Sequence, residues 1–158
     1  MRAFKIYTIV AIIFTALFSC KSKNTAVIAD KSLETSINLP DSIKSEIKEI
    51  TVQDDANLLE TDNFRIIETN VIGDILELTV SYGGGCKDHL FSMHTTGNYG
   101  KSYPPKLIVF LKHVGNGDMC KALLTEKIYF DLKSVQFRGS DILHLQLNNY
   151  DEFIIYTY

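Results

Sequence analysis

Segment 81–94, SYGGGCKDHLFSMH, gathers side chains that can take part in metal binding or covalent chemistry. Cys86 and His89 stand three positions apart, a spacing that suits half of a metal site or a thiol nucleophile with an adjacent base. Cys120 ends a second glycine-rich segment, 115–120, with the sequence GNGDMC. The two sulfur atoms can instead be joined in a disulfide. The residue types leave three hypotheses open: a metal site, a catalytic thiol or a structural crosslink.

The metal hypothesis rests on soft sulfur and imidazole ligands, which suit zinc or copper. The candidate ligands are Cys86, His89, His94, His113, Asp118 and Cys120, with Met93 and Met119 as thioether ligands for Cu(I). Cysteines bonded to each other cannot act as thiolates, and no second Cys-x-x-Cys or Cys-x-x-His pair completes a zinc site. We therefore expect no resident metal or cofactor. Zinc or copper binding by the region of Cys86, His89, His113 and Asp118 remains the alternative interpretation.

The catalytic hypothesis makes Cys86 a nucleophile, His89 its base and the glycine-rich backbone an oxyanion hole. A reactive thiolate needs a low-pKa, partly exposed site, and an oxidising compartment works against a free thiol. The Gly-x-Ser-x-Gly and His-Glu-x-x-His signatures are both absent from the sequence. We therefore expect no enzymatic activity.

Residues 1–19 have the composition of a secretory signal peptide. Arg2 and Lys5 supply positive charge, and the mostly apolar run 6–18 is shorter than the roughly 20 residues that span a bilayer. The sequence LFSC, which ends at Cys20, resembles the lipobox of bacterial lipoproteins, in which the cysteine is lipidated and becomes the first mature residue. This resemblance implies export and a firm lipid anchor, because several acyl chains hold a protein on a membrane.

The rest of the chain divides into a tether and one domain. Residues 20–38 are small and polar, as in flexible linkers, and 39–158 has the size of a single domain. The chain has 16 Lys and Arg against 19 Asp and Glu, a net charge of −3, and lacks the basic patch of nucleic-acid-binding proteins. We expect an anchor in the outer membrane with the domain on the periplasmic face, an envelope protein as possible partner, and no nucleic acid.

Once Cys20 is lipidated, two cysteines remain in an exported chain, and such a pair is expected to be oxidised. Cys86 and Cys120 each lie beside a glycine-rich turn. Closing a loop of this length would destabilise the unfolded state by about 3–4 kcal/mol in the chain-entropy model. His89 is expected to bond across this corner to a backbone carbonyl or to Asp118, which would make it a structural residue.

The two cysteine segments resemble a group of small lipoproteins, mostly from Bacteroidota, that share a Gly-Gly-Cys-x-x-His-x-Phe segment and a later Asp-x-Cys-x-Ala segment before a Phe-Asp-Leu strand. The matching residues are Gly84, Gly85, Cys86, His89 and Phe91, then Asp118, Cys120 and Ala122, then Phe130, Asp131 and Leu132. The resemblance covers about residues 75–135. It supports the lipoprotein architecture and implies no particular activity.

From residue 64 onward, apolar residues alternate with polar ones, a pattern typical of strands. The expected strands are 64–72, 75–82, 89–95, 106–114, 127–133, 142–147 and 153–158. Gly73-Asp74 suits a tight turn between the first two, and the near-continuous apolar run 106–114 predicts a central strand covered on both faces. His113 and His144 are expected on exposed or edge faces.

Isoleucines at 43, 47 and 50, after Pro40 and Asp41, predict a short amphipathic helix within 39–50. The sequence therefore predicts a mainly β fold: an antiparallel β-sandwich or small barrel of about seven strands with one short N-terminal helix. We expect a lipid-anchored envelope protein whose domain is a non-catalytic binding or structural module.

Overall fold

The computed structural model describes residues 46–158, which form a mainly β domain. The strands are β1 (Ile47–Val52), β2 (Arg65–Ile72), β3 (Ile75–Gly84), β4 (Leu90–Tyr99), β5 (Lys106–Val114), β6 (Ala122–Asp131), β7 (Ile142–Leu147) and β8 (Phe153–Thr157). Two short 3-10 helices, η1 (Ala56–Leu58) and η2 (Lys133–Val135), lie in connections. The predicted signal peptide, the lipidation site Cys20 and the predicted tether lie outside the described residues. Within 46–158, no helix is long and apolar enough to cross a membrane.

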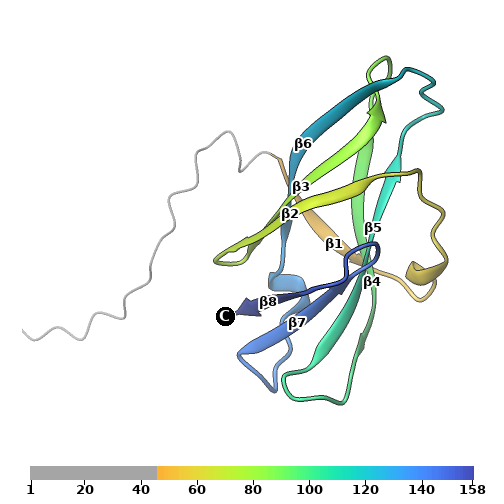
Figure 1. Ribbon diagram of the computed structural model, residues 1–158. Helices are drawn as coiled ribbons and strands as arrows, with labels where there is room; N and C mark the ends of the chain where they lie inside the picture. Colours follow the sequence, from red (N-terminus) through yellow and green to blue (C-terminus); the bar gives the residue numbers. More distant parts are fainter. Residues whose placement is uncertain (1–45) are drawn as a thin grey trace, which may run out of the picture. The chain divides into compact units, whose positions relative to one another are not determined.

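The eight strands form one sheet in the order β2-β3-β6-β1-β4-β5-β7-β8, which curls into a nearly closed barrel (Figure 1). At the seam between the end strands, the hydroxyls of Thr69 and Tyr150 are 3.3 Å apart. The predicted small barrel is confirmed, with one strand more than expected. The expectation of a purely antiparallel sheet is wrong, because β1 runs parallel to both β4 and β6, and β5 runs parallel to β7.

The core lies inside the barrel and follows the alternation of the strands. Leu76, Leu78 and Val80 of β3 point inward, as do Leu143, Leu145 and Leu147 of β7; all six are buried. Strand β5 differs from the prediction, because only one of its faces is covered: Leu107, Val109 and Leu111 are buried, whereas Ile108 is exposed. A single curled sheet has only one inner face to bury.

The predicted N-terminal helix is absent from the described part of the chain, where Ile47 and Ile50 belong to strand β1. The first half of β1 pairs with β6 (Ile47 opposite Tyr129) and the second half with β4 (Ile50 opposite Met93). β1 thereby joins the group β2-β3-β6 to the group β4-β5-β7-β8. A single helical turn would leave two strand edges unpaired, so tertiary pairing overrides the local helical pattern.

The pairing also brings two connections to the same end of the barrel. Gly84, at the end of β3, lies opposite Ala122, at the start of β6, and Leu90, at the start of β4, lies opposite Val114, at the end of β5. The β3–β4 connection and the β5–β6 connection therefore cross side by side between the two strand groups. These connections carry the predicted site residues.

Tyr156 holds together the opposite end of the barrel. Its hydroxyl donates a 2.6 Å hydrogen bond to Asp74 Oδ1 in the β2–β3 turn and accepts a 2.7 Å bond from Gln136 Nε2 after η2. Burial of the ring and the bond to Asp74 raise the pKa of this hydroxyl. One side chain from β8 thus contacts two distant parts of the chain.

We expect Tyr156→Phe to lower the free energy of unfolding by about 1–3 kcal/mol, because the change removes both hydrogen bonds of the buried Tyr156 side chain, one of them to the Asp74 carboxylate. Urea denaturation followed by circular dichroism measures this. Tyr103→Phe is the matched control, because Tyr103 is exposed and should give no change. A Tyr156→Phe variant as stable as the parent would show that this bond does not hold the barrel end.

Candidate functional site

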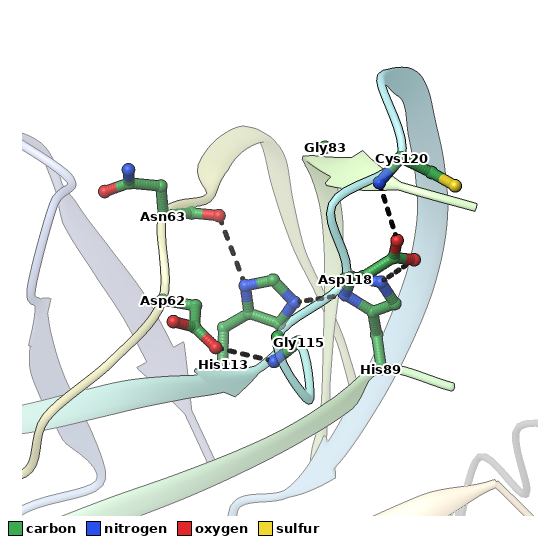
Figure 2. Close-up of a pocket in the computed structure, with 9 residues that line it drawn as sticks. Asp62, Asn63, Gly83, His89, His113, Gly115, Asp118 and Cys120 are labelled. Carbon is green, nitrogen blue, oxygen red and sulfur yellow. Dashed lines mark hydrogen bonds and ion pairs between the residues drawn. The ribbon is translucent and has the colours of Figure 1, made fainter. Parts of the chain in front are cut away.

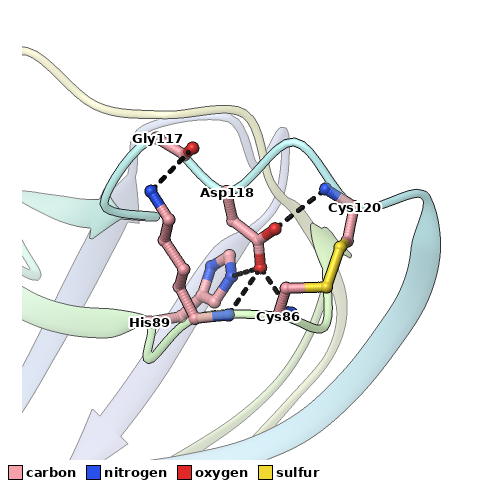
Figure 3. The surroundings of a disulfide bond; sticks show 6 residues. Cys86, His89, Gly117, Asp118 and Cys120 are labelled. Carbon is pink, nitrogen blue, oxygen red and sulfur yellow. Dashed lines mark hydrogen bonds and ion pairs between the residues drawn. A yellow bond between two sulfur atoms is a disulfide. The ribbon is translucent and has the colours of Figure 1, made fainter.

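The Cys86–Cys120 disulfide predicted from the sequence is present in the structure, with the two Cα atoms 5.9 Å apart (Figure 3). It joins the β3–β4 connection to the β5–β6 connection. The Asp118 carboxylate lies next to it and accepts three backbone hydrogen bonds, from Cys86 N (2.8 Å) and Lys87 N (2.9 Å) to Oδ2 and from Cys120 N (2.8 Å) to Oδ1. One carboxylate therefore fixes both connections at the crosslink. We call the disulfide, Asp118, His89 and His113 the clasp.

The glycines before Cys86 make room for this arrangement. A Cβ added to Gly84 would collide with the imidazole of His89 and lie 3.0 Å from Asp118 Oδ2. Gly84 and Gly85 also have φ values of 156° and 112°, which side chains disfavour. The glycine run therefore serves a close approach of backbone to side chains, which agrees with the interpretation of this run as a sharp corner.

A chain of hydrogen bonds leads from Asp118 into the barrel (Figure 2). Asp118 Oδ2 is 3.3 Å from His89 Nε2, and His89 Nδ1 is 2.8 Å from His113 Nε2. His113 Nδ1 is 3.2 Å from the carbonyl oxygen of Asn63. All four nitrogens of the two rings thus have a partner, and the His89 and Asp118 side chains are only 3% and 1% exposed.

The partners determine the number of protons in this chain. The Asn63 carbonyl and the Asp118 carboxylate can only accept, so His113 Nδ1 and His89 Nε2 must each carry a proton to bond them. One further proton is needed between the two rings. Three ring protons are therefore required, whereas two neutral imidazoles hold two, so the fully bonded pair carries one positive charge beside the Asp118 carboxylate.

Electrostatics indicate where that charge lies. Burial lowers the pKa of His113, because a desolvated imidazole disfavours the charged form. The backbone N–H groups of Cys120 and Cys86, with a smaller contribution from His89, hold the pKa of Asp118 well below its ordinary value. The neutral ring is therefore His113, and in the fully bonded pair the hydrogen-bond geometry puts the third ring proton on His89, between His113 and Asp118.

Aromatic rings surround the two imidazoles. The Tyr82 ring centroid lies 4.6 Å from that of His89 and 4.9 Å from that of His113, and Phe91 stacks on His113 at 4.5 Å. The Tyr82 hydroxyl donates a 2.5 Å hydrogen bond to Glu126 Oε2, and burial together with this bond raises the pKa of Tyr82 to about 12. This packing fixes the orientation of both histidine rings.

A third connection, between η1 and β2, completes the site, and sequence reasoning missed it. Thr61 Oγ1 accepts a 2.9 Å bond from His113 N, and Asp62 Oδ2 accepts a 2.7 Å bond from Gly115 N. Asn63 supplies the carbonyl for His113. These residues lie about 50 positions before their partners, and no local motif marks them. The clasp thus joins three connections at one end of the barrel.

The predicted candidate residues are partly brought together. The prediction that His113 lies on an exposed or edge face is wrong. The residue is 2% exposed and points inward from β5. His144 lies half-buried on the outer face of β7, as expected. His94 Nε2 lies 2.8 Å from Ser92 Oγ, and this pair is not part of the clasp. Met119 is exposed.

The geometry also bears on metal binding. Within residues 46–158, the side chains close enough together to hold a metal ion are those of Cys86, Asp118 and Cys120. Their ligand atoms lie within 4.8 Å of one another. The two sulfur atoms in it are bonded to each other. The alternative set of Cys86, His89, His113 and Asp118 is adjacent in space, but its imidazole nitrogens face hydrogen-bond partners rather than one common point.

A cavity of about 270 Å³ opens beside the two histidines. Its lining residues are Asp62, Asn63, Gly83, His89, His113, Gly115, Gly117, Asp118 and Cys120 (Figure 2). The cavity is therefore walled by the three connections and by polar groups that already bond one another. Such a wall can present backbone groups to a small polar ligand, but it offers neither a free thiolate nor an unbonded imidazole nitrogen.

Comparisons with known proteins show the fold. No protein-family model matches the chain, and no curated protein sequence matches it. A NigD-like immunity protein from Bacteroides caccae is similar in structure at 14% identity and a TM-score of 0.51, covering 69% of this chain and 58% of that protein. A protein of unknown function, DUF1344, from Bacteroides vulgatus matches at 12% identity and a TM-score of 0.52, covering 71% and 56%.

This chain therefore spans less than two thirds of the length of these two neighbours. A Bacteroides fragilis protein described as a candidate lipoprotein also matches, at 12% identity and a TM-score of 0.43, covering 71% and 68%, a score too low to carry an argument. The likeness agrees at the level of the fold with the Bacteroidota-type group that the sequence resembles.

Proposed function

We propose that this chain is a lipid-anchored cell-envelope protein whose β-barrel domain is a non-catalytic binding or structural module. One observation carries the second half of the proposal: the side chains that could perform chemistry are bonded to one another. The sulfurs of Cys86 and Cys120 form a disulfide, and His89 lies between Asp118 and His113. A nucleophile and a general base must each have a free atom facing substrate.

The clasp instead has the properties of a scaffold. It fixes three connections at one end of the barrel, and the cavity beside it is small and polar. A rigid end of a barrel from which loops project is a common place for a binding surface. The structural neighbours include a protein described as a NigD-like immunity protein, and the likeness at 14% identity concerns the fold alone.

Metal binding through Cys86, His89, His113 and Asp118 is the alternative function. It would require reduction of the disulfide and the loss of both histidine hydrogen bonds before four ligand atoms became available. The closeness of the two sulfurs to Asp118 is the observation that favours it. Metal analysis of the purified, unreduced protein separates the two functions, since the scaffold proposal expects less than stoichiometric zinc or copper.

The anchor is tested by labelling cells with radioactive palmitate and separating membranes from soluble protein. We expect the parent chain to carry label and to sediment with membranes, whereas Cys20→Ser should carry no label and remain unprocessed. The Cys86→Ser/Cys120→Ser double variant is the matched control and should retain the label. An unlabelled parent chain recovered in the soluble fraction would refute the anchor.

A further inference from the structure

Gly83 is a glycine that the fold itself does not require. Gly84 and Gly85 have positive φ values, whereas Gly83 does not, and a Cβ added to Gly83 would meet no atom within 4 Å. It lies in strand β3 opposite Leu123 of β6, where a glycine weakens the strand because it has no side chain to pack. A strand glycine of this kind is typical of a position that a ligand or another backbone approaches closely. Gly83 therefore marks a candidate contact with another molecule.

Two cavities adjoin at Gly83. The smaller is the cavity of about 270 Å³ beside the clasp, where Figure 2 shows Gly83 and Asn63. A wider cavity of about 420 Å³ lies between the start of β2 and the end of β3. Gly83 and Asn63 line both cavities, so the two form one groove that leads along the end of β3 to the clasp.

The groove exists because β2 and β3 separate before β3 ends. The first pair of their ladder is Arg65 with Ser81, and β3 continues past Ser81. The chain ahead of Arg65 bonds β5 instead, since the backbone N–H of Asp62 donates a 2.9 Å hydrogen bond to the carbonyl of His113. Within the described residues, the edge of 82–84 that faces away from β6 therefore has no strand partner. Its backbone groups can bond a second chain.

The wider cavity has an apolar rim. Ile67 of β2 is 54% exposed and Leu123 of β6 is 79% exposed. Phe64 also lines this cavity, and its half-buried ring packs against the core. An apolar side chain placed here would remove apolar surface of all three residues from water, which is favourable.

The smaller cavity offers a negative charge instead. Asp62 Oδ2 accepts the hydrogen bond from Gly115 N, and among the described residues Oδ1 has neither a hydrogen bond nor an ion pair. The Asp118 carboxylate lines the same cavity, but its oxygens already accept three backbone hydrogen bonds and face His89. Arg65 lines the wider cavity and disfavours a second basic group there. A basic side chain is therefore attracted to Asp62, at the clasp end of the groove.

We propose that this groove binds an extended peptide segment of a partner protein, with an apolar side chain in the wider cavity and a lysine or arginine side chain beside Asp62. The peptide backbone lies over Gly83 along the unpaired edge of 82–84. Alternate residues of an extended chain point the same way and are about 7 Å apart. The apolar and basic residues of the peptide are therefore two positions apart, like Phe64 and Asp62 in the wall of the groove.

This inference rests on the proposed binding role of the domain and names the class of partner. An array of pentapeptides, probed with the oxidised full chain in detergent, tests it. The peptides carry leucine or serine at the second position and lysine, glutamate or serine at the fourth, or the reverse order, with threonine elsewhere. We expect the peptides that combine leucine with lysine to bind about tenfold or more tightly than those with serine at either position.

Three variants locate the binding. Gly83→Leu places a side chain in the open space of the groove and should lose the binding, with a melting temperature no lower than that of the parent. Gly100→Leu is the matched control, because an added Cβ there makes only ordinary contacts, at 3.6 Å, outside the groove. Leu123→Ser, at an exposed rim position, should weaken the binding without affecting the fold.

The outcomes separate the groove from other surfaces. Binding that is lost in Gly83→Leu, weakened in Leu123→Ser and retained in Gly100→Leu supports the proposal. Equal binding by the parent and Gly83→Leu overturns it, as does a parent that binds no peptide of the array or prefers glutamate to lysine. If Gly83→Leu melted early, Leu123→Ser alone would decide between these results. The proposed non-catalytic function is tested independently, by the metal analysis and the palmitate labelling described above.

Discussion

Replacing Asp118 with asparagine will lower the melting temperature of the domain by roughly 10 °C or more. The carboxylate accepts backbone hydrogen bonds from Cys86, Lys87 and Cys120 and also contacts His89. Asparagine preserves the shape but turns one acceptor atom into a donor that faces backbone N–H groups. It also removes the negative charge that faces His89 Nε2. Differential scanning calorimetry at neutral pH measures the change.

The same variant changes the response of stability to acid. Because the folded-state pKa of Asp118 is lowered, the unfolded chain binds a proton more readily than the folded one. The stability from Asp118 is therefore fully present above its unfolded pKa of about 3.9 and is lost as the pH falls below that value. Between about pH 4 and pH 2, the parent should lose stability more steeply than Asp118→Asn.

Asp88→Asn is the matched control, because it makes the same change in the β3–β4 connection. Among the described residues, the Asp88 carboxylate has no hydrogen bond; only the backbone carbonyl accepts one, from Asn116. This control should melt within a few degrees of the parent. If Asp118→Asn also did so, Asp118 would not be the residue that holds the two connections together.

Removing the crosslink is the second large perturbation. The Cys86→Ser/Cys120→Ser variant should lose about 3–4 kcal/mol of unfolding free energy, because the disulfide closes a loop with a sequence separation of 34 and restricts the unfolded chain. Urea denaturation at equilibrium measures this loss. The parent protein in the presence of a phosphine reductant should show the same midpoint as the variant.

Agreement between the reduced parent and the variant would assign the effect to the covalent bond rather than to the serines. A loss below about 1 kcal/mol in both would mean that Asp118 and the histidine chain hold the connections without the disulfide. In that case the two sulfur atoms would have to be reconsidered as metal ligands or nucleophiles. The zinc or copper alternative would then gain support.

The sequence predicted the parts of the fold that depend on local periodicity. The alternation of Leu76, Leu78 and Val80 with polar residues identified β3 and its buried face, and Gly73-Asp74 marked the turn before it. The same reasoning failed for β5, where an apolar run suggested burial on both faces. Outward residues such as Ile108 are apolar without being covered, so composition did not reveal the number of layers.

Strand β1 shows what periodicity cannot distinguish. Ile47 and Ile50 are three residues apart, which fits a helical turn as well as a strand with one half-buried and one buried residue. The strand forms because it pairs with edges of β4 and β6, which lie about 40 and 80 positions later in the chain. Its parallel direction likewise depends on partners that a local pattern does not specify.

The site was predicted where chemistry and spacing coincide. The disulfide between Cys86 and Cys120 was predicted because a pair of cysteines in an exported chain is expected to be oxidised. The contact of His89 with Asp118 was predicted from the residue types beside the two cysteines. The inward position of His113 and the contribution of Asn63 could not be predicted, because they depend on where a distant connection passes. The sequence thus indicated the members of the clasp near Cys86 but not the third connection.

The histidines of the clasp are bonded to each other and to fixed acceptors, the Asp118 carboxylate and the Asn63 carbonyl. The imidazole ¹⁵N–¹H correlation spectrum of the oxidised protein tests it most directly. We expect His113 as a neutral ring protonated at Nδ1 and His89 protonated at Nδ1 with its Nε2 proton bonded to Asp118, and neither ring should change when zinc is added. Rings that exchange between tautomers, or nitrogen signals that move with zinc, would contradict the account.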